Sequence, residues 1–151
     1  MATFVHYRYS EAIHPIHTVF TVGTLPLFLG ALLADIAYGR SFEIQWSNFA
    51  SWLIVGGLIF VTIALLFAIA DVFRAHRRAR GFGLYFLSLL VAWGLGVFNA
   101  LIHARDAWAI MPEAIVVSAA ATLAACVSAW LAVPAPRMTV MKRETSHGLE
   151  R

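Results

Sequence analysis

Charged residues and cysteine are both scarce in this chain. Asp, Glu, Lys and Arg together make up only 13% of its 151 residues, whereas a soluble domain usually carries about 25%. This scarcity excludes a soluble hydrolase and a soluble nucleic-acid-binding protein. Cys126 is the sole cysteine, so an intrachain disulfide is impossible, and we interpret it as a small packing residue. The chain also lacks a nucleotide-binding glycine loop, a catalytic triad and a pair of carboxylates within one apolar segment.

Hydrophobic residues, in contrast, account for 61% of the chain. Leu, Ile, Val, Ala, Phe and Gly dominate four stretches, at residues 15–38, 46–73, 82–104 and 111–133. A helix needs about 20 apolar residues to cross a hydrocarbon core about 30 Å thick, and each stretch reaches that length. We therefore predict an all-α integral membrane protein, a four-helix up-and-down bundle in contact with the lipid bilayer. A polar segment, 1–14, precedes the bundle, a polar loop, 39–45, joins the first two spans, and a polar tail, 134–151, follows.

The basic residues are distributed unevenly between the two sides of the predicted bundle. Only Arg40 and Arg105 fall on one side; the other side has Arg8, Arg74, Arg77, Arg78, Arg80, Arg137, Lys142, Arg143 and Arg151. Loops rich in Lys and Arg stay in the cytoplasm, so we predict that both termini are cytoplasmic and that the protein lies in a bacterial inner membrane. The first apolar run is too long for a cleavable signal peptide and has no small-residue cleavage site behind it. Residues 1–14 are therefore expected to stay attached.

Small and aromatic residues indicate how the helices pack. We expect helix contacts at Gly56, Gly57, Gly94 and Gly96, because small side chains let backbones approach closely in lipid. Aromatic residues are expected to form belts at the two membrane interfaces. These are Tyr38, Trp46, Trp52 and Trp108 on the outer side and Tyr7, Tyr9, Tyr85 and Trp130 on the inner side. Pro26 predicts a kink in the first span.

Six histidines are a notable number for so apolar a chain. His14 and His17 share one face at the cytoplasmic start of the first span, His76 lies in the cytoplasmic loop, and His103 ends the third span at the outer side. Ionisable residues at membrane depth are costly, so a functional role is their default interpretation. Neutral imidazole binds haem iron and several transition metals. We therefore take all four histidines as candidate cofactor ligands, and His14, His17 and His103 also as candidate metal ligands.

The spacing of these histidines argues against a simple haem site. From Phe82 to His103 the third span is about 31 Å long, at about 1.5 Å per residue. His103 should therefore lie a full bilayer away from His14 and His17. One haem could join the two ends only if a helix were broken or if the second ligand came from another copy in a homo-oligomer. A pair formed by His17 and His76 at the cytoplasmic side is a further alternative.

Other polar residues suggest smaller sites. A zinc ion held by His14 and His17 would need a third ligand, which Glu11 is placed to supply. Asp71 lies one helical turn from Arg74 and is expected to pair with it. A polar group is expected at the outer end, formed by Asp35, His103, Arg105, Asp106 and Glu113. That group is either a hydrogen-bonded rim or a docking or proton-handling site that faces the periplasm.

The start of the first span carries a family resemblance. His14-Pro15-Ile16-His17, followed by a long apolar helix with an internal proline, resembles the small bacterial membrane family catalogued as domain of unknown function 2231. That family typically has four predicted helices, and its third tends to end in a Gly-rich segment followed by a histidine, here 94–99 and His103. The resemblance covers about residues 13–133. Many members have a further proline and a further histidine where this chain has Thr18 and Val22.

The resemblance implies a membrane protein without a settled activity. Related domains are joined to, or encoded near, periplasmic sugar-aldehyde dehydrogenases, which implies an electron-accepting membrane partner that carries haem b. We therefore predict a membrane electron-transfer subunit that binds haem b and passes electrons from a periplasmic donor, such as a dehydrogenase, toward quinone. The alternative is a cofactor-free membrane anchor or assembly subunit of a larger complex. A transporter of small solutes or metals ranks below both, because few polar residues fall at mid-membrane positions.

Overall fold

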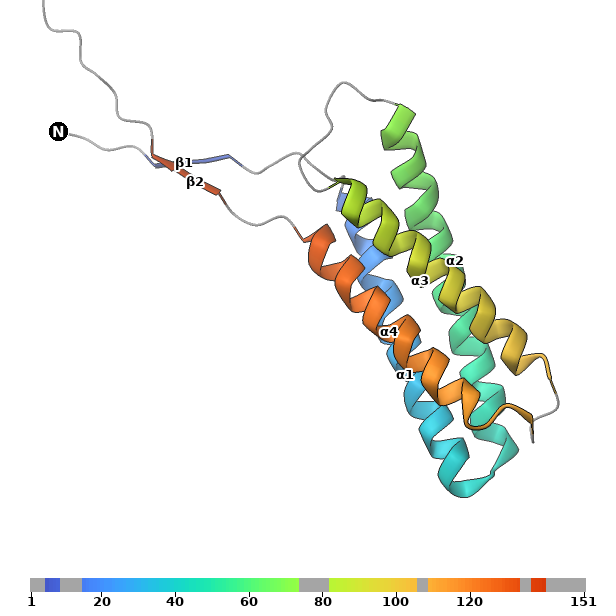
Figure 1. Ribbon diagram of the computed structural model, residues 1–151. Helices are drawn as coiled ribbons and strands as arrows, with labels where there is room; N and C mark the ends of the chain where they lie inside the picture. Colours follow the sequence, from blue (N-terminus) through green and yellow to red (C-terminus); the bar gives the residue numbers. More distant parts are fainter. Residues whose placement is uncertain (1–4, 9–14, 74–81, 106–108, 134–136, 141–151) are drawn as a thin grey trace, which may run out of the picture.

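Four long helices dominate the computed structural model, which describes residues 5–8, 15–73, 82–105, 109–133 and 137–140. They are α1 (Pro15–Ser41), α2 (Ile44–Phe73), α3 (Phe82–His103) and α4 (Glu113–Ala132). Figure 1 shows them packed side by side, with alternating directions. Each is long and apolar enough to cross a membrane. The predicted four-helix membrane bundle is therefore confirmed, and the outer surface of this multi-pass protein faces the lipid bilayer.

The two ends of the bundle differ in what they hold. α1 begins and α4 ends at one end, which we call the terminal end. α1 turns into α2 at the opposite end, which we call the hairpin end, and His103 and Glu113 also lie there because α3 ends and α4 begins at that end. α1 packs against α2 and α4, and α3 packs against the same two helices, so the four helices enclose one interior.

The first two helices extend beyond their apolar stretches. α1 continues to Ser41 and α2 begins at Ile44, so only Phe42 and Glu43 separate them and the predicted polar loop 39–45 is mostly helical. Ser41 Oγ accepts a hydrogen bond from the Glu43 backbone N–H at 3.3 Å. Backbone groups near a membrane still need partners, and continued helix supplies them. α1 also runs through Pro26 as one helix.

Two short strands pair with each other outside the helical bundle. β1 (Val5–Arg8) pairs with β2 (Arg137–Val140) in an antiparallel register, with Val5 opposite Val140. Figure 1 shows this pair away from the bundle. The sequence predicted only polar terminal segments here. The pairing joins residues from opposite ends of the chain, and local sequence patterns carry no information about such a distant partner.

One large side chain fills the middle of the interior. Phe28 of α1 is buried, and its ring lies against the backbone of Gly57 in α2 and of Gly96 in α3. A methyl group at Gly96 would come within 2.8 Å of the Phe28 ring, and one at Gly57 would overlap it. The expectation that Gly94 marks a helix contact is wrong, because in the described part of the chain no atom of another helix lies within 4 Å of the place that a Cβ would take there. Gly94 precedes Gly96 by two residues and therefore lies on the opposite side of the helix.

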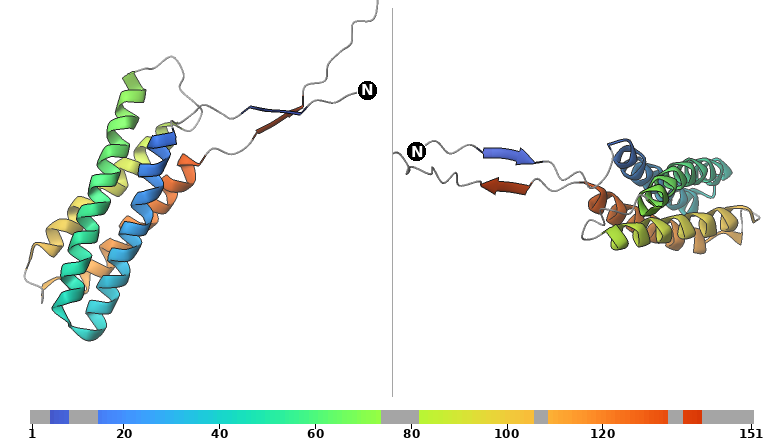
Figure 2. Two further views of the ribbon diagram at one scale, coloured as in Figure 1. Left: turned by 180° about the vertical axis from the view of Figure 1, so that it is seen from behind. Right: turned by 90° about the horizontal axis from the view of Figure 1, so that it is seen from above.

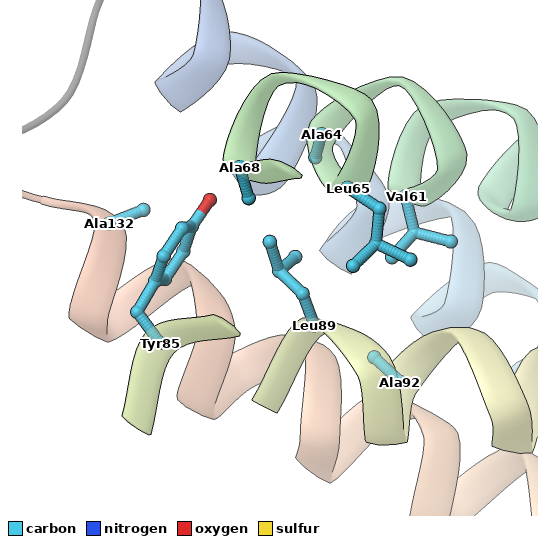
Figure 3. Close-up of a cluster of buried hydrophobic side chains, with 8 residues drawn as sticks. All are labelled: Val61, Ala64, Leu65, Ala68, Tyr85, Leu89, Ala92 and Ala132. Carbon is cyan, nitrogen blue, oxygen red and sulfur yellow. The ribbon is translucent and has the colours of Figure 1, made fainter. Parts of the chain in front are cut away.

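A second packed group lies nearer the terminal end. Figure 3 shows side chains of α2 facing those of α3, with one residue of α4 beside them: Val61, Ala64, Leu65, Ala68, Tyr85, Leu89, Ala92 and Ala132. Half of this group is alanine, which lets the helices approach closely. The large Tyr85 ring extends from α3 toward Ala68. Its phenol is thereby carried into the interior of the bundle.

Three assignments from the sequence are corrected by burial. Tyr38 and Tyr85 were expected in the aromatic belts, yet each is only 2% exposed. Trp46, Trp52 and Trp130 are exposed, as expected for belt residues. Cys126 was interpreted as a packing residue but is exposed on α4. Hydropathy cannot separate the inner and outer faces of a helix that is apolar all round, so these assignments depended on the rotation of each helix.

Candidate functional site

Two networks of polar side chains inside the bundle contain a histidine, one at each end. The hairpin-end network consists of Asp35, Asn99, His103 and Ser118. The terminal-end network consists of His17, Thr21, Asp71 and Tyr85. Each contains one buried histidine, and a buried ionisable group in a membrane protein is a functional candidate. We therefore treat both networks as candidate sites.

The hairpin-end network surrounds a fully buried carboxylate. Asp35 of α1 is 0% exposed, and its Oδ1 lies 2.9 Å from His103 Nε2 of α3. Ser118 Oγ of α4 donates to Asp35 Oδ2 at 2.5 Å. Asn99 Nδ2, also from α3, donates to Ser118 Oγ at 2.7 Å. Both carboxylate oxygens are thus bonded, and the network ties three helices together.

Hydrogen-bond chemistry restricts where the protons of this network lie. His103 Nδ1 is 3.0 Å from the backbone oxygen of Asn99, and because a carbonyl oxygen only accepts, Nδ1 must carry a hydrogen. Ser118 supplies the hydrogen between its Oγ and Asp35 Oδ2. The remaining proton therefore lies between His103 Nε2 and Asp35 Oδ1. Wherever it sits along that bond, the His103–Asp35 pair is neutral as a whole, which lowers the cost of burying it.

The terminal-end network is built mainly from neutral groups. Thr21 Oγ1 donates to the backbone oxygen of His17 at 3.1 Å, so the Tyr85 hydroxyl, 2.7 Å away, donates to Thr21. His17 Nε2 lies 2.7 Å from the same hydroxyl and must donate to it. Asp71 Oδ2 lies 3.8 Å from His17 Nδ1, with its side chain 35% exposed. The Asp71 carboxylate is therefore partly accessible at the protein surface, whereas Asp35 is completely buried.

Several of the predicted site residues meet in the structure. His103 contacts Asp35, and Arg105 Nη1 donates to Glu113 Oε2 at 3.0 Å, so four members of the predicted polar group lie at the hairpin end. The fifth member, Asp106, lies outside the described residues, as do Arg74, His14, His76 and Glu11. The predicted pairing of Asp71 with Arg74 and the ligand roles of His14 and His76 therefore stay predictions.

His17 and His103 do not fit as the two axial ligands of one haem. Asp35, the partner of His103, follows His17 by eighteen residues of α1, or about 27 Å of helix. Each Nε2 atom is also held by a protein group, in His103 by Asp35 and in His17 by Tyr85. Each Nε2 atom would have to leave its partner before it could bind iron. Within the described ranges, no group of three His, Cys, Asp or Glu residues is placed to hold a metal ion.

An open pocket of about 590 Å³ lies beside the hairpin-end network. Its wall comes from the first turns of α2 and the end of α3: Ile44, Gln45, Ser47, Asn48, Ser51, His103 and Arg105. His103 therefore belongs both to the buried network and to the pocket wall. A smaller cavity of about 430 Å³ adjoins it and shares Gln45, with Glu43, Trp46 and Phe49 as its other lining residues. We call the larger one the hairpin-end pocket.

Sequence reasoning missed three network residues: Thr21, Tyr85 and Ser118. Thr21 and Ser118 were not distinguished from ordinary small or polar residues of the spans, and Tyr85 was assigned to a belt. One signal was present, because Thr21 follows His17 by four residues and His103 follows Asn99 by four, a spacing that places both members on one helix face. Paired polar residues on one face of an apolar helix indicate a buried network more reliably than a single histidine does.

Comparison with known proteins places the chain in a family. A family model described as a predicted membrane protein (DUF2231) matches residues 10–133. Neither the curated proteins nor the solved structures gave a match. The matched range includes all four helices and both networks. Since it spans most of the chain, this protein belongs to the membrane-protein family named domain of unknown function 2231.

Proposed function

We propose that this protein is a cofactor-free subunit of the bacterial inner membrane that anchors or assembles a larger complex. The observation that carries the proposal is that both described buried histidines use Nε2 to bond another helix. His103 joins α3 to α1 through Asp35, and His17 joins α1 to α3 through Tyr85. Neither Nε2 is presented to a ligand. The histidines therefore act as internal ties that fix one arrangement of the helices.

Such ties suit an anchoring role because lipid provides no hydrophobic force between helices. Association in a bilayer depends on close packing and on interhelical hydrogen bonds. The two networks supply such bonds at both ends, while Phe28 and its facing glycines supply packing in the middle. A bundle held in this way presents a fixed surface to a partner. In this proposal both termini face the cytoplasm, as the basic residues predict.

The anchoring role is tested by locating the partner with and without this chain. A strain that lacks the gene should release a periplasmic dehydrogenase activity from the membrane fraction into the soluble fraction, and the wild-type gene should restore it. The tagged 16.6 kDa chain, solubilised in mild detergent from native membranes, should run as part of a larger complex of fixed stoichiometry. A chain that runs alone, with unchanged dehydrogenase distribution, would contradict the proposal.

An electron-transfer role with haem b is the second candidate. It is supported by the place of His103 in the wall of an open pocket at the hairpin end, where only 2% of its side chain is exposed. Haem would supply one-electron chemistry between a periplasmic donor and quinone. This role requires His103 to exchange Asp35 for iron, or it requires His14 or His76 to act as ligands.

An optical spectrum separates the two candidates. The purified protein, expressed with ample haem, is measured oxidised and then reduced with dithionite. The cofactor-free proposal expects no Soret absorbance. Sharp reduced bands of a b-type cytochrome would support the second candidate instead, and single replacements of His14, His17, His76 and His103 by Ala would then identify the ligands. Asp35→Ala is the matched variant, because it removes the partner of His103 Nε2 without removing an imidazole.

A further inference from the structure

The hairpin-end pocket combines a membrane-interface position with a polar wall. It lies where α2 begins and α3 ends, next to a cavity that is lined by the exposed Trp46. Exposed tryptophans mark the headgroup level of a bilayer. Two hydroxyls, two carboxamides and one guanidinium line the pocket, from Ser47, Ser51, Gln45, Asn48 and Arg105. Its contents would therefore meet lipid headgroups rather than acyl chains.

The charges at the pocket come as a pair of opposite sign. Arg105 uses Nη1 to bond Glu113 Oε2 at 3.0 Å, and a guanidinium has four further N–H donors for a ligand. The side chains of Arg105 and Glu113 are both about half exposed, so both can be reached from outside. Asp35 adds no free charge behind the wall, because it is neutralised by His103. A phosphate next to Arg105 would thus lie near a carboxylate that favours a positive group.

The adjoining cavity adds a second acidic side chain near Arg105. It shares Gln45 with the pocket and is lined by Glu43 and Trp46. A carboxylate and an indole face are the groups that bind ammonium ions, the first by charge and the second by cation–π attraction. The combined surface therefore offers an anion-binding guanidinium flanked by acidic residues. This pattern complements a zwitterion better than it complements a simple anion.

We propose that the hairpin-end pocket binds the headgroup of a zwitterionic phospholipid with a primary ammonium group. In this arrangement the phosphate contacts Arg105 and the carboxamide donors of Gln45 and Asn48 on α2. The ammonium lies toward Glu113 or Glu43, and the acyl chains extend into the bilayer along the outside of the bundle. The proposal does not depend on the anchoring role.

Lipid binding by the delipidated full-length chain in detergent micelles tests the proposal. Native mass spectrometry measures the binding of phosphatidylethanolamine and of phosphatidylglycerol with the same acyl chains. We expect phosphatidylethanolamine to bind about fivefold more tightly, because one exposed charge interaction contributes up to about 1 kcal/mol. Equal affinities for the two lipids in the wild-type protein would overturn the zwitterion assignment.

Charge variants at the same end of the bundle identify the site. Arg105→Gln should weaken phosphatidylethanolamine binding about fivefold. Arg40→Gln is the matched control, because Arg40 is exposed in the last turn of α1 and does not line the pocket. Glu113→Gln together with Glu43→Gln should abolish the preference for phosphatidylethanolamine, because it removes both carboxylates toward which the ammonium can lie. Equal losses in Arg105→Gln and Arg40→Gln would show non-specific attraction and overturn the site.

Free headgroups distinguish a lipid from a soluble phosphate compound. Inorganic phosphate and phosphoethanolamine are added at millimolar concentration to the protein with bound phosphatidylethanolamine. Neither should displace the lipid, because they lack the acyl chains that hold it against the bundle. Displacement by phosphoethanolamine at the affinity of the whole lipid would overturn the assignment to a membrane lipid.

Discussion

The two ends of the bundle bury the same kind of side chain in different ways. At the hairpin end, His103 meets a carboxylate that is completely enclosed, and both oxygens of Asp35 are bonded. At the terminal end, His17 meets the phenol of Tyr85, and its nearest carboxylate, Asp71, remains 35% exposed. A buried charge needs a complete set of partners, whereas neutral groups need only their hydrogen bonds. The hairpin-end network therefore depends more strongly on a complete set of hydrogen-bond partners than the terminal-end network does.

The middle of the bundle keeps the two networks apart. Phe28 lies between them, packed with Ala121 and Ala125 in an apolar cluster. The described residues include no hydrogen bond that joins one network to the other. The two ends should therefore respond to substitution independently, and the following variants test that comparison.

The largest effect is expected at Asp35. Asp35→Ala leaves His103 and Ser118 buried without their acceptor, so the free energy of unfolding should fall by about 3–5 kcal/mol. Asp71→Ala is the matched control at the other end and should cost less than about 1 kcal/mol, because Asp71 is partly exposed. Unfolding in mixed micelles measures both. Equal losses would show that the two carboxylates are not buried differently.

The second-largest loss of stability is expected from overpacking around Phe28. Gly57→Ala places a methyl group where the Phe28 ring lies, with an expected loss of about 1–3 kcal/mol. A smaller side chain in Phe28→Leu should recover part of that loss in the double variant. Gly94→Ala is the control, since that position is open, and its stability should not fall. A loss at Gly94 equal to that at Gly57 would contradict the packing described for Phe28.

The neutral network should be less sensitive than the charged one. Tyr85→Phe removes the hydroxyl that bonds His17 and Thr21 and should cost about 0.6–1.7 kcal/mol, the range measured for hydrogen bonds between membrane helices. Combined with Asp35→Ala, its effect should add within about 0.5 kcal/mol, because the sites share no partner. Strong non-additivity would mean that the packing around Phe28 couples the stability of one network to that of the other.

The surface pair at the hairpin end should contribute least. Glu113→Gln removes the negative charge that faces Arg105, whose side chain is about half exposed, so the loss should stay below about 1 kcal/mol. The small difference from wild type should shrink further at high salt, because exposed charges are screened. A salt-independent loss as large as that of Asp35→Ala would show that this pair is buried in the membrane-embedded protein.

The membrane-spanning architecture follows from sequence because it depends on length and hydropathy alone. A lipid-embedded backbone has to satisfy its own polar groups, so a run such as residues 46–73 has helix as its only monomeric solution. The family assignment was likewise accessible, since the motif from His14 to His17 and the helix pattern indicated it before the match to residues 10–133. The sequence predicted that Asp35 and His103 belong to one polar group at the outer end, but it did not predict the hydrogen bond between them.

Tertiary structure alone decided which atoms meet. The rotation of each helix about its axis determines whether Tyr85 faces lipid or His17, and a helix that is apolar all round carries little information about that rotation. The same rotation turned Gly94 outward and Gly96 toward Phe28, although the two glycines are chemically identical. The sequence by itself determined how many times the chain crosses the membrane and which polar residues share an end. Packing between helices decided that both described buried histidines are bonded to protein partners.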